Sequence, residues 1–536
     1  MSLRPTALLP EEATRRHGAG EWGTVALGEL FRRTCAARPD EEALVDGACR
    51  LTFADWERRS AAAARGLLDL GVRPGDVVAY QLPNWWEAAV LFVAAARIGA
   101  VVNPVLPIFR ERELAFILRQ SGATALAIPG EFRGCDHPAL VAAVRDQAPA
   151  LRAVLVARAA APSGTTALDD LLATPGPPPA APVDADALLM LMYTSGTTAD
   201  PKGVLHSHNT LLAEVRSLAR MHALTPADRT LMPSPLTHIS GVIHAILTPA
   251  VLGTSAVLME RWDPDAALAT IAAERVTYMV GAPTFLQDLT DRAERAGLRP
   301  PALRLFSCGG AAVPPDLIRR ARAALGCVAK RVYGSTEFPT ITTTGAADAE
   351  TMGADTEGRV IAPAELRIVD ADGRALPAGA EGEVQARGPE CCLGYADAAL
   401  SADAFTADGW FRTGDLGTVD ATGYLRITGR IKEIVIRKGE KFSLREIEEA
   451  IARHPAVAEA AVVALPDPRS GERACAVVVP RSGATLTLAE LSTFLVAAGL
   501  ARQKLPEQLE LVAALPRTDS GKVHRAALRD RVSAGR

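Results

Sequence analysis

One short segment carries the residues best suited to binding a charged ligand. It reads Tyr193-Thr-Ser-Gly-Thr-Thr-Ala-Asp-Pro-Lys202-Gly203-Val204 and follows an apolar run, Leu188–Tyr193, that predicts a strand. Backbone N–H groups, hydroxyl groups and a lysine together neutralise phosphate oxygens, so the segment predicts a polyphosphate site. It lacks the Gly-Lys-Ser/Thr of a Walker A loop. The small residues that would cradle the phosphates are Thr194, Ser195, Gly196, Thr197 and Thr198.

Further motifs follow this loop along the chain. They are Pro235-Leu-Thr-His238, Gly309-Gly310-Ala311-Ala312, Tyr333-Gly-Ser-Thr-Glu337, Gly388 to Tyr395, Trp410-Phe-Arg-Thr-Gly-Asp415, Gly429-Arg430-Ile-Lys432 and Pro516-Arg-Thr-Asp-Ser-Gly-Lys522. In this order the motifs resemble those of the adenylate-forming superfamily. That superfamily comprises acyl- and aryl-CoA synthetases, adenylation domains of nonribosomal peptide synthetases and firefly-type luciferases. The resemblance covers nearly the whole chain.

The resemblance implies a first half-reaction in which a carboxylate attacks the α-phosphate of ATP and expels pyrophosphate. Both reactants are anions, so the site must cancel charge and hold an in-line geometry. ATP and Mg²⁺ are the implied cofactors, and a small-molecule carboxylic acid is the implied partner. By the same resemblance, Glu337 would hold Mg²⁺ as a hard oxygen ligand, and Thr336 would hydrogen-bond the α-phosphate.

The resemblance also implies how the nucleoside is bound. Tyr333 would stack on adenine, and small residues would line the adenine slot because they allow close approach of the backbone. Asp415 would accept both ribose hydroxyl groups with its two carboxylate oxygens, and Arg430 would support the ribose or a phosphate. The other residues implied at the nucleotide site are Lys202, Gly310, Ala311, Ala312, Gly334 and Ser335.

Three further roles rest on the resemblance. Lys522 would bridge the carboxylate and the α-phosphate during adenylation. His238 would sit between the acid pocket and the α-phosphate, which makes it a catalytic residue together with Lys522, Thr336 and Glu337. Lys432 would be the hinge about which a small C-terminal domain rotates between the two half-reactions.

The acid pocket is expected along His238-Ile239-Ser240-Gly241, Gly281-Ala282-Pro283 and Phe338-Pro339-Thr340, with Gly310 and Gly334 beside them. These segments are mostly small and apolar and hold no carboxylate for an amino group, which favours a simple carboxylic acid over an amino acid. The run that begins at Asn103 is similar to alicyclic acid-CoA ligases and to coronafacate ligases, which form an amide with an amino acid. An alicyclic or aryl acid is the expected substrate.

The loop after the hinge leaves the acyl acceptor open. Many bacterial acyl-CoA ligases have a glycine where Lys438 stands and an asparagine where Lys441 stands, whereas Gly439 is retained. The two lysines could hold a phosphate of CoA, mark a site rebuilt for another acceptor, or have no role. CoA is the preferred acceptor, and an amino acid or a carrier protein is the alternative. Nothing in the sequence supports a luciferase-like oxidase.

The elements that must position these residues alternate between strand-like and helical patterns. Val77–Leu82, Trp85–Ile98 and Ala100–Pro104 read as strand, helix and strand, which predicts a largely parallel, doubly wound α/β fold. Possible capping boxes at Ser443–Glu446 and Thr487–Glu490 predict helices near the C-terminus. We expect a large N-terminal domain, residues 1–430, of doubly wound sheets with a small β-barrel-like part. A hinge at 431–432 and a small mobile α+β domain at 433–536 would follow.

The composition excludes several classes of protein. Hydrophobic residues make up 49% and charged residues 22% of 536, as in globular proteins, which argues against a disordered chain, a coiled coil or a collagen. A net charge of -4 gives no basic footprint for nucleic acid. Eight cysteines without a CxxC pair predict reduced thiols. We expect a cytoplasmic protein without a signal peptide or a membrane span.

Overall fold

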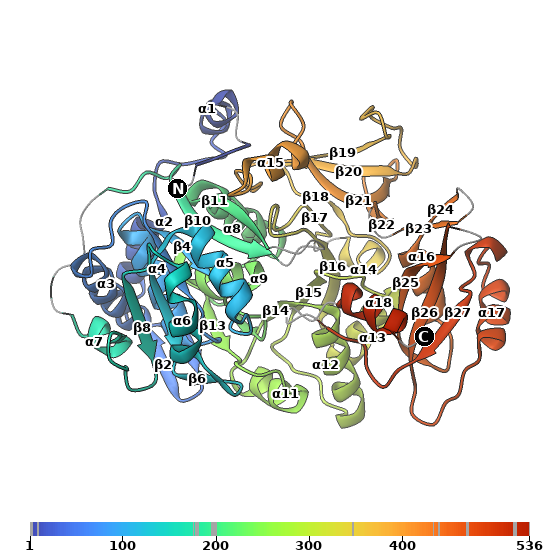
Figure 1. The fold of residues 1–536 in the computed structure, drawn as a ribbon, viewed down its shortest axis with the longest axis horizontal. Coiled ribbons are helices and arrows are strands. Elements are labelled where there is room, and N and C mark those ends of the chain that lie inside the picture. The colour runs from blue at the N-terminus through green and yellow to red at the C-terminus, as the bar shows by residue number, and fades with distance from the viewer. Residues whose placement is uncertain are drawn as a thin grey trace.

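The computed structural model describes residues 4–7, 10–174, 176, 182–194, 201–345, 348–431, 434–437, 440–467, 471–517 and 523–534. Two sheets rich in parallel strands form most of the molecule, a small antiparallel sheet lies beside them, and a further sheet belongs to the C-terminal residues (Figure 1). The expectation of a mixed α/β fold with parallel sheets is confirmed.

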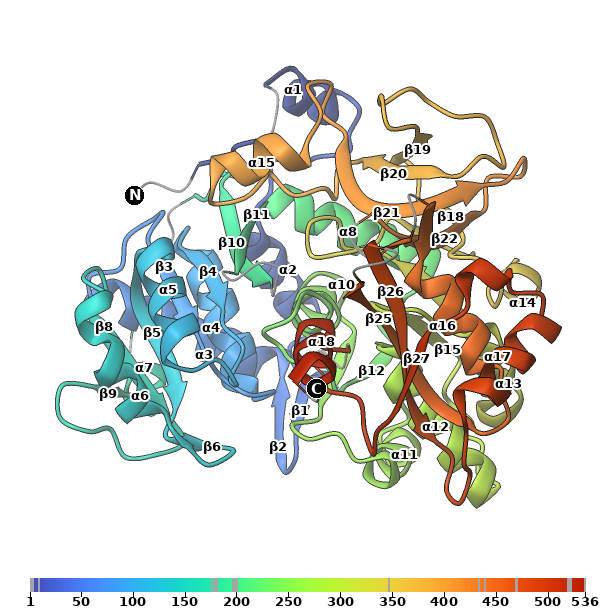
Figure 2. The same cartoon turned by 45° about the vertical axis from the view of Figure 1, so that its right-hand side comes forward.

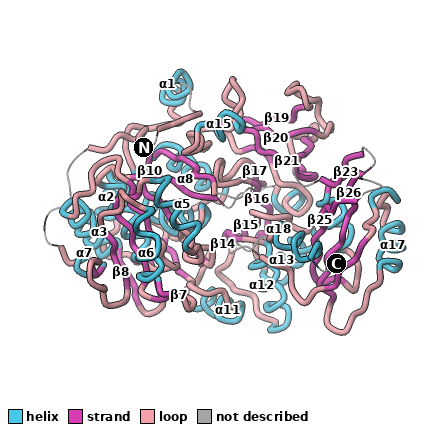
Figure 3. The backbone as a smooth tube through the Cα atoms, viewed as in Figure 1, coloured by secondary structure: helices cyan, strands magenta, loops and turns pink. Residues whose placement is uncertain are grey.

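The first large sheet has the strand order β11-β10-β4-β3-β5-β8-β9 and is parallel except for the β10–β11 pair. Alternate residues of β3 face opposite layers: Val78 packs with α3 and α4, and Val77 with α5 and α6, so helices cover both faces (Figure 3). The elements are β3 (Val77–Tyr80), β4 (Val101–Pro104), β5 (Ala123–Pro129), β8 (Ala153–Ala157), β9 (Thr166–Ala167), β10 (Leu188–Thr194), β11 (Lys202–Ser207), α3 (Phe53–Asp69), α4 (Trp86–Arg97), α5 (Glu111–Ser121) and α6 (His137–Val144).

The second large sheet has the order β18-β17-β16-β15-β14-β12-β13-β1-β2 and is parallel from β16 to β1. Helices α11, α12 and α13 share a core with one face of it, as Ile271, Leu286, Ile318 and Phe306 show. The elements are β1 (Glu42–Asp46), β2 (Cys49–Thr52), β12 (Arg229–Met232), β13 (Ser255–Leu258), β14 (Tyr278–Gly281), β15 (Leu305–Gly309), β16 (Val328–Tyr333), β17 (Thr342–Thr343), β18 (Arg359–Val360), α11 (Pro264–Ala273), α12 (Pro283–Ala296) and α13 (Pro315–Leu325).

The remaining elements before residue 360 are short or connect the two large sheets. They are α1 (Pro10–Gly18), α2 (Leu27–Ala37), β6 (Glu131–Phe132), β7 (Cys135–Asp136), η1 (Arg145–Gln147), α7 (Leu168–Leu172), α8 (His208–Met221), α9 (Ile239–Gly241), η2 (Val242–Leu247), α10 (Thr248–Leu252) and α14 (Ala349–Met352). Helix α8 begins directly after β11, with Ser207 as its N-cap, so it continues the chain from the predicted phosphate-binding segment.

The small antiparallel sheet replaces the expected barrel-like part. Its order is β19 (Glu365–Val369), β20 (Gly382–Arg387), β21 (Phe411–Val419) and β22 (Leu425–Arg430), with α15 (Ala398–Ala404) in the connection before β21. Among the described residues no pairing joins β19 to β22, so the sheet stays open. The reason lies at β22, where Leu425 forms a bridge with Gly358 of the large domain instead.

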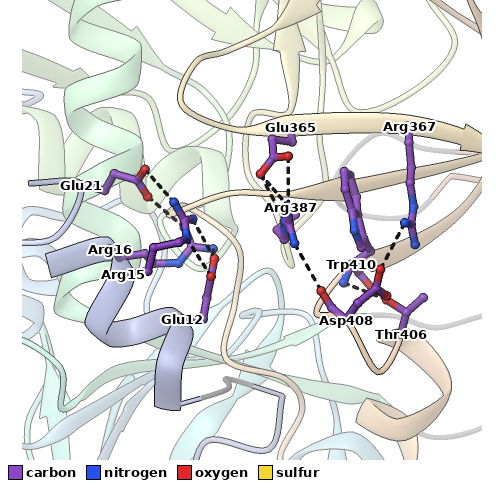
Figure 4. A network of polar contacts seen from close by, with 10 residues as sticks. All are labelled: Glu12, Arg15, Arg16, Glu21, Glu365, Arg367, Arg387, Thr406, Asp408 and Trp410. Carbon is purple, nitrogen blue, oxygen red and sulfur yellow. Dashed lines mark hydrogen bonds and ion pairs between the residues drawn. The ribbon is translucent and has the colours of Figure 1, made fainter. Parts of the chain in front are cut away.

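Helix α1 lies beside this small sheet. Glu12 pairs with Arg16 at 2.7 Å on α1, and Arg387 pairs with Glu365 at 2.9 Å on the sheet (Figure 4). The guanidinium groups of Arg367 and Arg387 both lie over the Trp410 ring, at 4.3 and 4.7 Å from its centroid. A cavity of about 320 Å³ lies between the charged residues of α1 and those of the small sheet. The Trp22 indole N–H, just after α1, donates to the Pro389 carbonyl at 3.0 Å and connects the two ends of residues 10–430.

The C-terminal residues form a sheet with cores of their own. Helices α16 and α17 cover one face and α18 covers the other, as Ile447, Leu491 and Leu528 show (Figure 2). This separate α+β region agrees with the expectation. Its elements are β23 (Ile434–Arg437), β24 (Glu440–Ser443), α16 (Leu444–Ala452), β25 (Val457–Asp467), β26 (Gly471–Pro480), α17 (Leu488–Ala497), η3 (Arg502–Lys504), β27 (Gln508–Leu511) and α18 (Arg525–Ala534).

The two predicted capping boxes differ. At α17 the box is complete, because the Thr487 and Glu490 side chains each accept the other residue's backbone N–H. At α16 the Glu446 N–H donates to Ser443 Oγ at 3.5 Å, but the Glu446 carboxylate binds Lys504 Nζ at 2.6 Å. The full box predicted there is therefore wrong, since a cation competes for its carboxylate.

Ion pairs and a hydrogen bond connect the C-terminal region to the rest of the chain. Arg445 of α16 lies 3.3 Å from Glu357, which also contacts Arg331 at 3.2 Å. Ser443 Oγ donates to the Thr428 carbonyl at 2.7 Å. All eight cysteines are free thiols, as expected. In the described parts of the chain, no helix is both long and apolar enough to cross a bilayer.

Candidate active site

Three neighbouring parallel strands bring the predicted pocket residues to one edge of the second sheet. The strands β14, β15 and β16 are paired in register, with Gly281 opposite Cys308 and Gly309 opposite Val332. Gly281, Gly310 and Gly334 therefore follow one another at the carboxyl ends of adjacent strands. This edge is where open α/β sheets bind ligands.

Tight backbone packing explains the glycines at this edge. A Cβ atom on Gly334 would lie 2.0 Å from the Pro339 carbonyl oxygen, because residues 334–339 form a compact turn. Within it, the Ser335 N–H donates to the Phe338 carbonyl at 2.9 Å. Gly310 has φ of 82°, which favours glycine, and it is exposed together with Ala311 and Ala312. The predicted adenine slot is thus open to solvent.

The residue predicted to stack on adenine and the two predicted at the ribose form a continuous network. The Tyr333 hydroxyl donates to Asp415 Oδ2 at 2.6 Å, and Arg430 Nε lies 2.8 Å from Asp415 Oδ1. Burial and the neighbouring Asp415 charge raise the pKa of Tyr333 well above its usual value, so the phenol remains a donor. Each Asp415 oxygen keeps a lone pair, and two vicinal hydroxyl groups could donate to them.

The predicted phosphate-binding segment begins and ends on one hairpin. Thr194 and Lys202 are cross-strand partners on β10 and β11, so they stand side by side at its mouth. Lys202 Nζ lies 5.7 Å from the centroid of the Tyr395 ring, and the Tyr395 hydroxyl donates to Glu337 Oε1 at 2.7 Å. The structure therefore connects the lysine of this segment with the carboxylate of the 333–337 motif. Ser195, Gly196, Thr197 and Thr198 lie outside the described residues.

Residues 391–396 run alongside β11 and connect it to the 333–337 motif. The Leu205 N–H donates to the Gly394 carbonyl at 2.9 Å, and the Leu393 N–H donates back to the Leu205 carbonyl at 2.8 Å. One residue earlier, the Cys392 N–H donates to the Glu337 carbonyl at 2.7 Å. Glu337 is thus held through both its backbone and its side chain.

Two residues of this site had no role in the sequence analysis. Tyr395 stood in a quoted motif, but the sequence did not show that its hydroxyl reaches Glu337. His206 is buried on β11, and its Nε2 lies 2.8 Å from the Thr336 carbonyl oxygen. The available signal was a histidine inside an otherwise apolar strand, Val204-Leu-His-Ser207. Thr336 itself is buried.

Glu337 has the chemistry that a magnesium–nucleotide complex needs. Tyr395 occupies Oε1, and a carboxylate offers a second oxygen to a cation. Among the described residues, no group of three or more acidic, histidine or cysteine side chains could hold a metal ion on its own. Magnesium in phosphate-transferring sites is commonly held by one or two carboxylates and the substrate phosphates. A single carboxylate beside the phosphate-binding hairpin fits that pattern.

His238 caps the short helix α9. Its Nδ1 accepts from the Ser240 N–H at 3.3 Å and lies 2.9 Å from Ser240 Oγ, which fixes the direction of the ring. Ile239 is buried, and a Cβ atom on Gly241 would lie 2.0 Å from the Pro235 carbonyl oxygen. Residues 235–241 therefore fold tightly on themselves, with His238 and Ser240 half-buried.

Several predicted residues lie outside what the structure describes. They are Lys432, Lys438, Gly439 and Lys522, and only the backbone of Lys441 is described, in β24 opposite Ile436. Next to Lys522, Arg517 and Val523 form an antiparallel bridge, and Arg517 pairs with Glu459.

Comparison with known proteins matches most of the chain to one family. The family described as AMP-binding enzyme matches residues 31–396, and its C-terminal domain matches residues 446–522. The chain belongs to the AMP-binding enzyme family. Its two-part match spans the parallel sheets and the separate C-terminal region.

Three relatives illustrate the range of the AMP-binding enzyme family. The medium-chain fatty-acid–CoA ligase of Escherichia coli (strain K12) is 36% identical over 515 residues, 95% of this chain and 91% of the relative. The structure of an anthranilate CoA ligase with anthranoyl-AMP has a TM-score of 0.87 and 25% identity, covering 96% of this chain and 98% of that one. An amide bond synthetase from Marinactinospora thermotolerans has a TM-score of 0.82 and 29% identity, covering 94% and 99%.

The family assignment defines the type of reaction. The chain is an ATP-dependent ligase of the AMP-forming acid-thiol type, which activates a carboxylic acid and transfers the acyl group to CoA. The amide synthetase among its structural neighbours fits the alternative acceptor.

Proposed function

We propose that this protein converts an alicyclic or aryl carboxylic acid to an acyl-adenylate and passes the acyl group to CoA. The observation that carries the proposal is the pair of anchored carboxylates at one strand edge. Asp415 is held by Tyr333 and Arg430, and Glu337 is held by Tyr395 beside Lys202. This arrangement suits a nucleotide whose ribose meets Asp415 and whose phosphates, with Mg²⁺, meet Glu337.

The roles of individual residues follow from this placement. Thr194, Lys202 and Thr336 contact the phosphates, with Thr336 at the α-phosphate. Magnesium, when bound at Glu337, reduces the negative charge that the attacking carboxylate meets. His238, oriented by Ser240, separates the acid pocket from the nucleotide. Lys522 bridges the acid and the α-phosphate, as an ammonium group should when two anions must approach.

The proposed acid is apolar and compact. The carboxyl ends of β14–β16 carry the glycines Gly281, Gly310 and Gly334, and Ile239 and Pro339 add apolar side chains. No carboxylate belongs to this set, so an amino group on the acid would find no partner here. A structure of similar architecture, an anthranilate CoA ligase, supports the proposal of an aryl acid.

The acyl acceptor and the domain movement complete the proposal. Residues 1–430 form the nucleotide and acid sites, 431–432 form a hinge at Lys432, and 433–536 form the moving domain. Lys438, Gly439 and Lys441 face the acceptor, which is CoA. An amino acid is the second candidate, supported by the amide bond synthetase of similar structure, whereas the lysines at 438 and 441 are compatible with either acceptor. Loading of a carrier protein is a further variant of the thiol reaction.

Mass spectrometry of products tests the proposal. The protein is incubated with ATP, Mg²⁺ and a panel of aliphatic, aryl and alicyclic acids, with CoA and mixed amino acids offered together. An acyl-CoA as the dominant product, with AMP released, supports the CoA reaction. An N-acyl amino acid as the dominant product would mean that the acyl acceptor is an amine rather than CoA. AMP and pyrophosphate without either product rule out both acceptors and direct the search to a carrier protein.

A hinge variant separates the two half-reactions. Proline fixes φ and removes a backbone donor. Lys432→Pro should therefore leave acyl-adenylate formation within a few-fold of the wild type and strongly impair acyl transfer. Adenylate formation is measured as acid-dependent exchange of pyrophosphate into ATP, and transfer as acyl-CoA release. An equal loss of both would contradict the hinge at this position.

A further inference from the structure

His206 lies directly behind the segment that holds Thr336 and Glu337. It is fully buried on β11, and its Nε2 is 2.8 Å from the Thr336 carbonyl oxygen. Its Nδ1 is 3.0 Å from Thr210 Oγ1 on α8. Both ring nitrogens therefore have a partner, one on the 333–337 motif and one on the helix that follows the phosphate-binding hairpin.

The partners determine the tautomer of this ring. A carbonyl oxygen can only accept, so Nε2 must carry the proton and donate to Thr336. Nδ1 then holds a lone pair and accepts from the Thr210 hydroxyl, whose single proton the Ser207 carbonyl, at 3.1 Å, also approaches. Burial lowers the pKa of His206 to about 4, so the ring stays neutral and keeps this arrangement at ordinary pH.

The bond acts on the peptide group between Thr336 and Glu337. That group is planar, so holding its carbonyl oxygen also fixes the orientation of the N–H and Cα of Glu337. The Cys392 N–H holds the next carbonyl, and the Tyr395 hydroxyl holds the carboxylate. His206 is the contact that comes from β11 itself, the strand that begins with Lys202.

We propose that His206 is a positioning residue that holds the Thr336–Glu337 peptide in register with the phosphate-binding hairpin. This inference rests on the proposed function, in which Thr336 and Glu337 meet the phosphates and Mg²⁺. Loss of the donor leaves the Thr336 carbonyl buried without a partner and lets the peptide rotate. The metal ligand and the α-phosphate contact then lose their common orientation to Lys202.

The chain offers a matched control two residues away. His208 is equally buried, and burial likewise lowers its pKa to about 4. Its Nδ1, however, accepts from the Leu27 N–H at 3.2 Å at the start of α2. A substitution at His208 therefore disturbs a buried histidine without removing a bond to the 333–337 motif.

The test compares four variants with the wild type by acid-dependent exchange of pyrophosphate into ATP. His206→Leu removes the donor, and we expect the exchange rate to fall about tenfold to a hundredfold, as for a buried carbonyl left unpaired. The half-saturating Mg²⁺ concentration should rise, and KM for the acid should stay within about twofold of the wild type. His208→Leu should keep the exchange rate within about threefold.

Rescue separates positioning from packing. The amide nitrogen of glutamine reaches about as far as Nε2 of histidine, whereas that of asparagine is too short. His206→Gln should therefore restore the exchange rate to within a few-fold of the wild type, and His206→Asn should resemble His206→Leu. The comparison of His206→Gln with His206→Asn tests the positioning role even if His206→Leu folds poorly. Melting temperatures measure any loss of stability separately.

Three results would overturn the inference. They are a His206→Leu rate within twofold of the wild type, equal losses in the His206→Leu and His208→Leu variants, and equal rates for His206→Gln and His206→Asn. The affinity for ATP with Mg²⁺, measured by calorimetry, distinguishes failure of the positioning role of His206 from failure of the proposed function. A wild type without acid-dependent exchange would contradict the proposed function. Weaker Mg²⁺–ATP binding in His206→Leu would still support the positioning role.

Discussion

Asp415 and Glu337, the two carboxylates of the proposed nucleotide site, are held in different ways. Asp415 faces Arg430 across one hairpin, fifteen positions along the chain, and its other partner is Tyr333. The supports of Glu337 come from distant segments, namely the hydroxyl of Tyr395 and, through the preceding peptide, the ring of His206. Strand register fixes one support of Asp415, namely Arg430, whereas both supports of Glu337 depend on long-range packing, as does the bond from Tyr333 to Asp415.

This difference predicts different consequences of substitution. In the proposed site, Asp415 meets the ribose, a part of ATP that does not react, so this ribose end should contribute mainly to binding. Glu337, at the proposed magnesium end, would meet the charge that develops at the phosphates, where preorganised groups lower the barrier. Substitutions at the two ends should therefore separate into effects on KM for ATP and effects on kcat.

The largest effect is expected for Glu337→Gln. The amide still accepts from Tyr395 but loses the negative charge that binds Mg²⁺. A unit charge ~4 Å from its partner at an effective dielectric near ~20 contributes ~4 kcal/mol. Loss of that amount lowers acyl-adenylate formation by ~10³. Pyrophosphate exchange measures it, with Glu365→Gln on the small sheet as the control. A rate within tenfold of the wild type would remove Glu337 from the metal site.

Asp415→Asn should act on the other end. It weakens the contact with Arg430 and replaces one acceptor oxygen by a donor, so one ribose hydroxyl loses its partner. Hydrogen bonds to charged groups contribute about 1.5–3 kcal/mol, and KM for ATP should rise about tenfold to a hundredfold. The kcat value should change by only a few-fold. A drop in kcat equal to the rise in KM would end the distinction between the two regions.

Tyr395→Phe tests the support of Glu337 alone. The variant keeps the ring under Lys202 and removes one hydrogen bond to the carboxylate. A bond of about 1 kcal/mol corresponds to a rise of about fivefold in the half-saturating Mg²⁺ concentration. A titration of exchange rate against Mg²⁺ measures it. An unchanged Mg²⁺ dependence with a changed KM for ATP would assign Tyr395 to nucleotide binding instead.

The smallest effect that we expect is a pH-dependent change in stability that depends on Glu214 of α8. The Glu214 side chain binds Thr340, the residue after Pro339. Glu214 is fully buried, and Thr340 Oγ1 donates to its carboxyl at 2.6 Å. Burial, and secondarily Glu390, raise the pKa of Glu214 from 4.5 to about 8. Because the folded pKa lies above the unfolded one, this stabilisation is complete below pH 4.5 and is lost as the pH rises to about 8.

Glu214→Gln copies the protonated carboxyl at every pH. Its melting temperature should therefore equal that of the wild type near pH 4.5 and exceed it by about 3 °C near pH 8.5. Thermal unfolding across this range measures the difference. A constant difference at all pH values would mean that Glu214 does not titrate in this window.

The sequence predicted most of the fold because local residue patterns determine where most strands and helices begin and end. The alternation of apolar runs gave β3, α4 and β4 within one or two residues, and the Thr487 capping box starts α17 as expected. The barrel-like part and the full capping box at Ser443 were wrong. Both depend on partners far along the chain, Gly358 and Lys504, that no local pattern contains.

The sequence predicted only part of the candidate site. The resemblance placed Tyr333, Asp415 and Arg430 at the nucleotide site, and the structure brings their side chains together, although each belongs to a different motif. His206 and Tyr395 were not assigned, since a buried histidine in a strand and a tyrosine in a loop show no partner until the chain folds. The roles of Lys432, Lys438, Lys441 and Lys522 remain predictions, to be tested by the variants and products above.

The nucleotide product of the reaction tests the central claim most directly. The protein is given ATP, Mg²⁺ and the acid panel without CoA or an amine, and labelled pyrophosphate is followed into ATP. Our account predicts exchange that depends on the acid and needs no acceptor, with AMP as the nucleotide released when CoA is added. Acid-dependent release of ADP and phosphate, without pyrophosphate exchange, would contradict it.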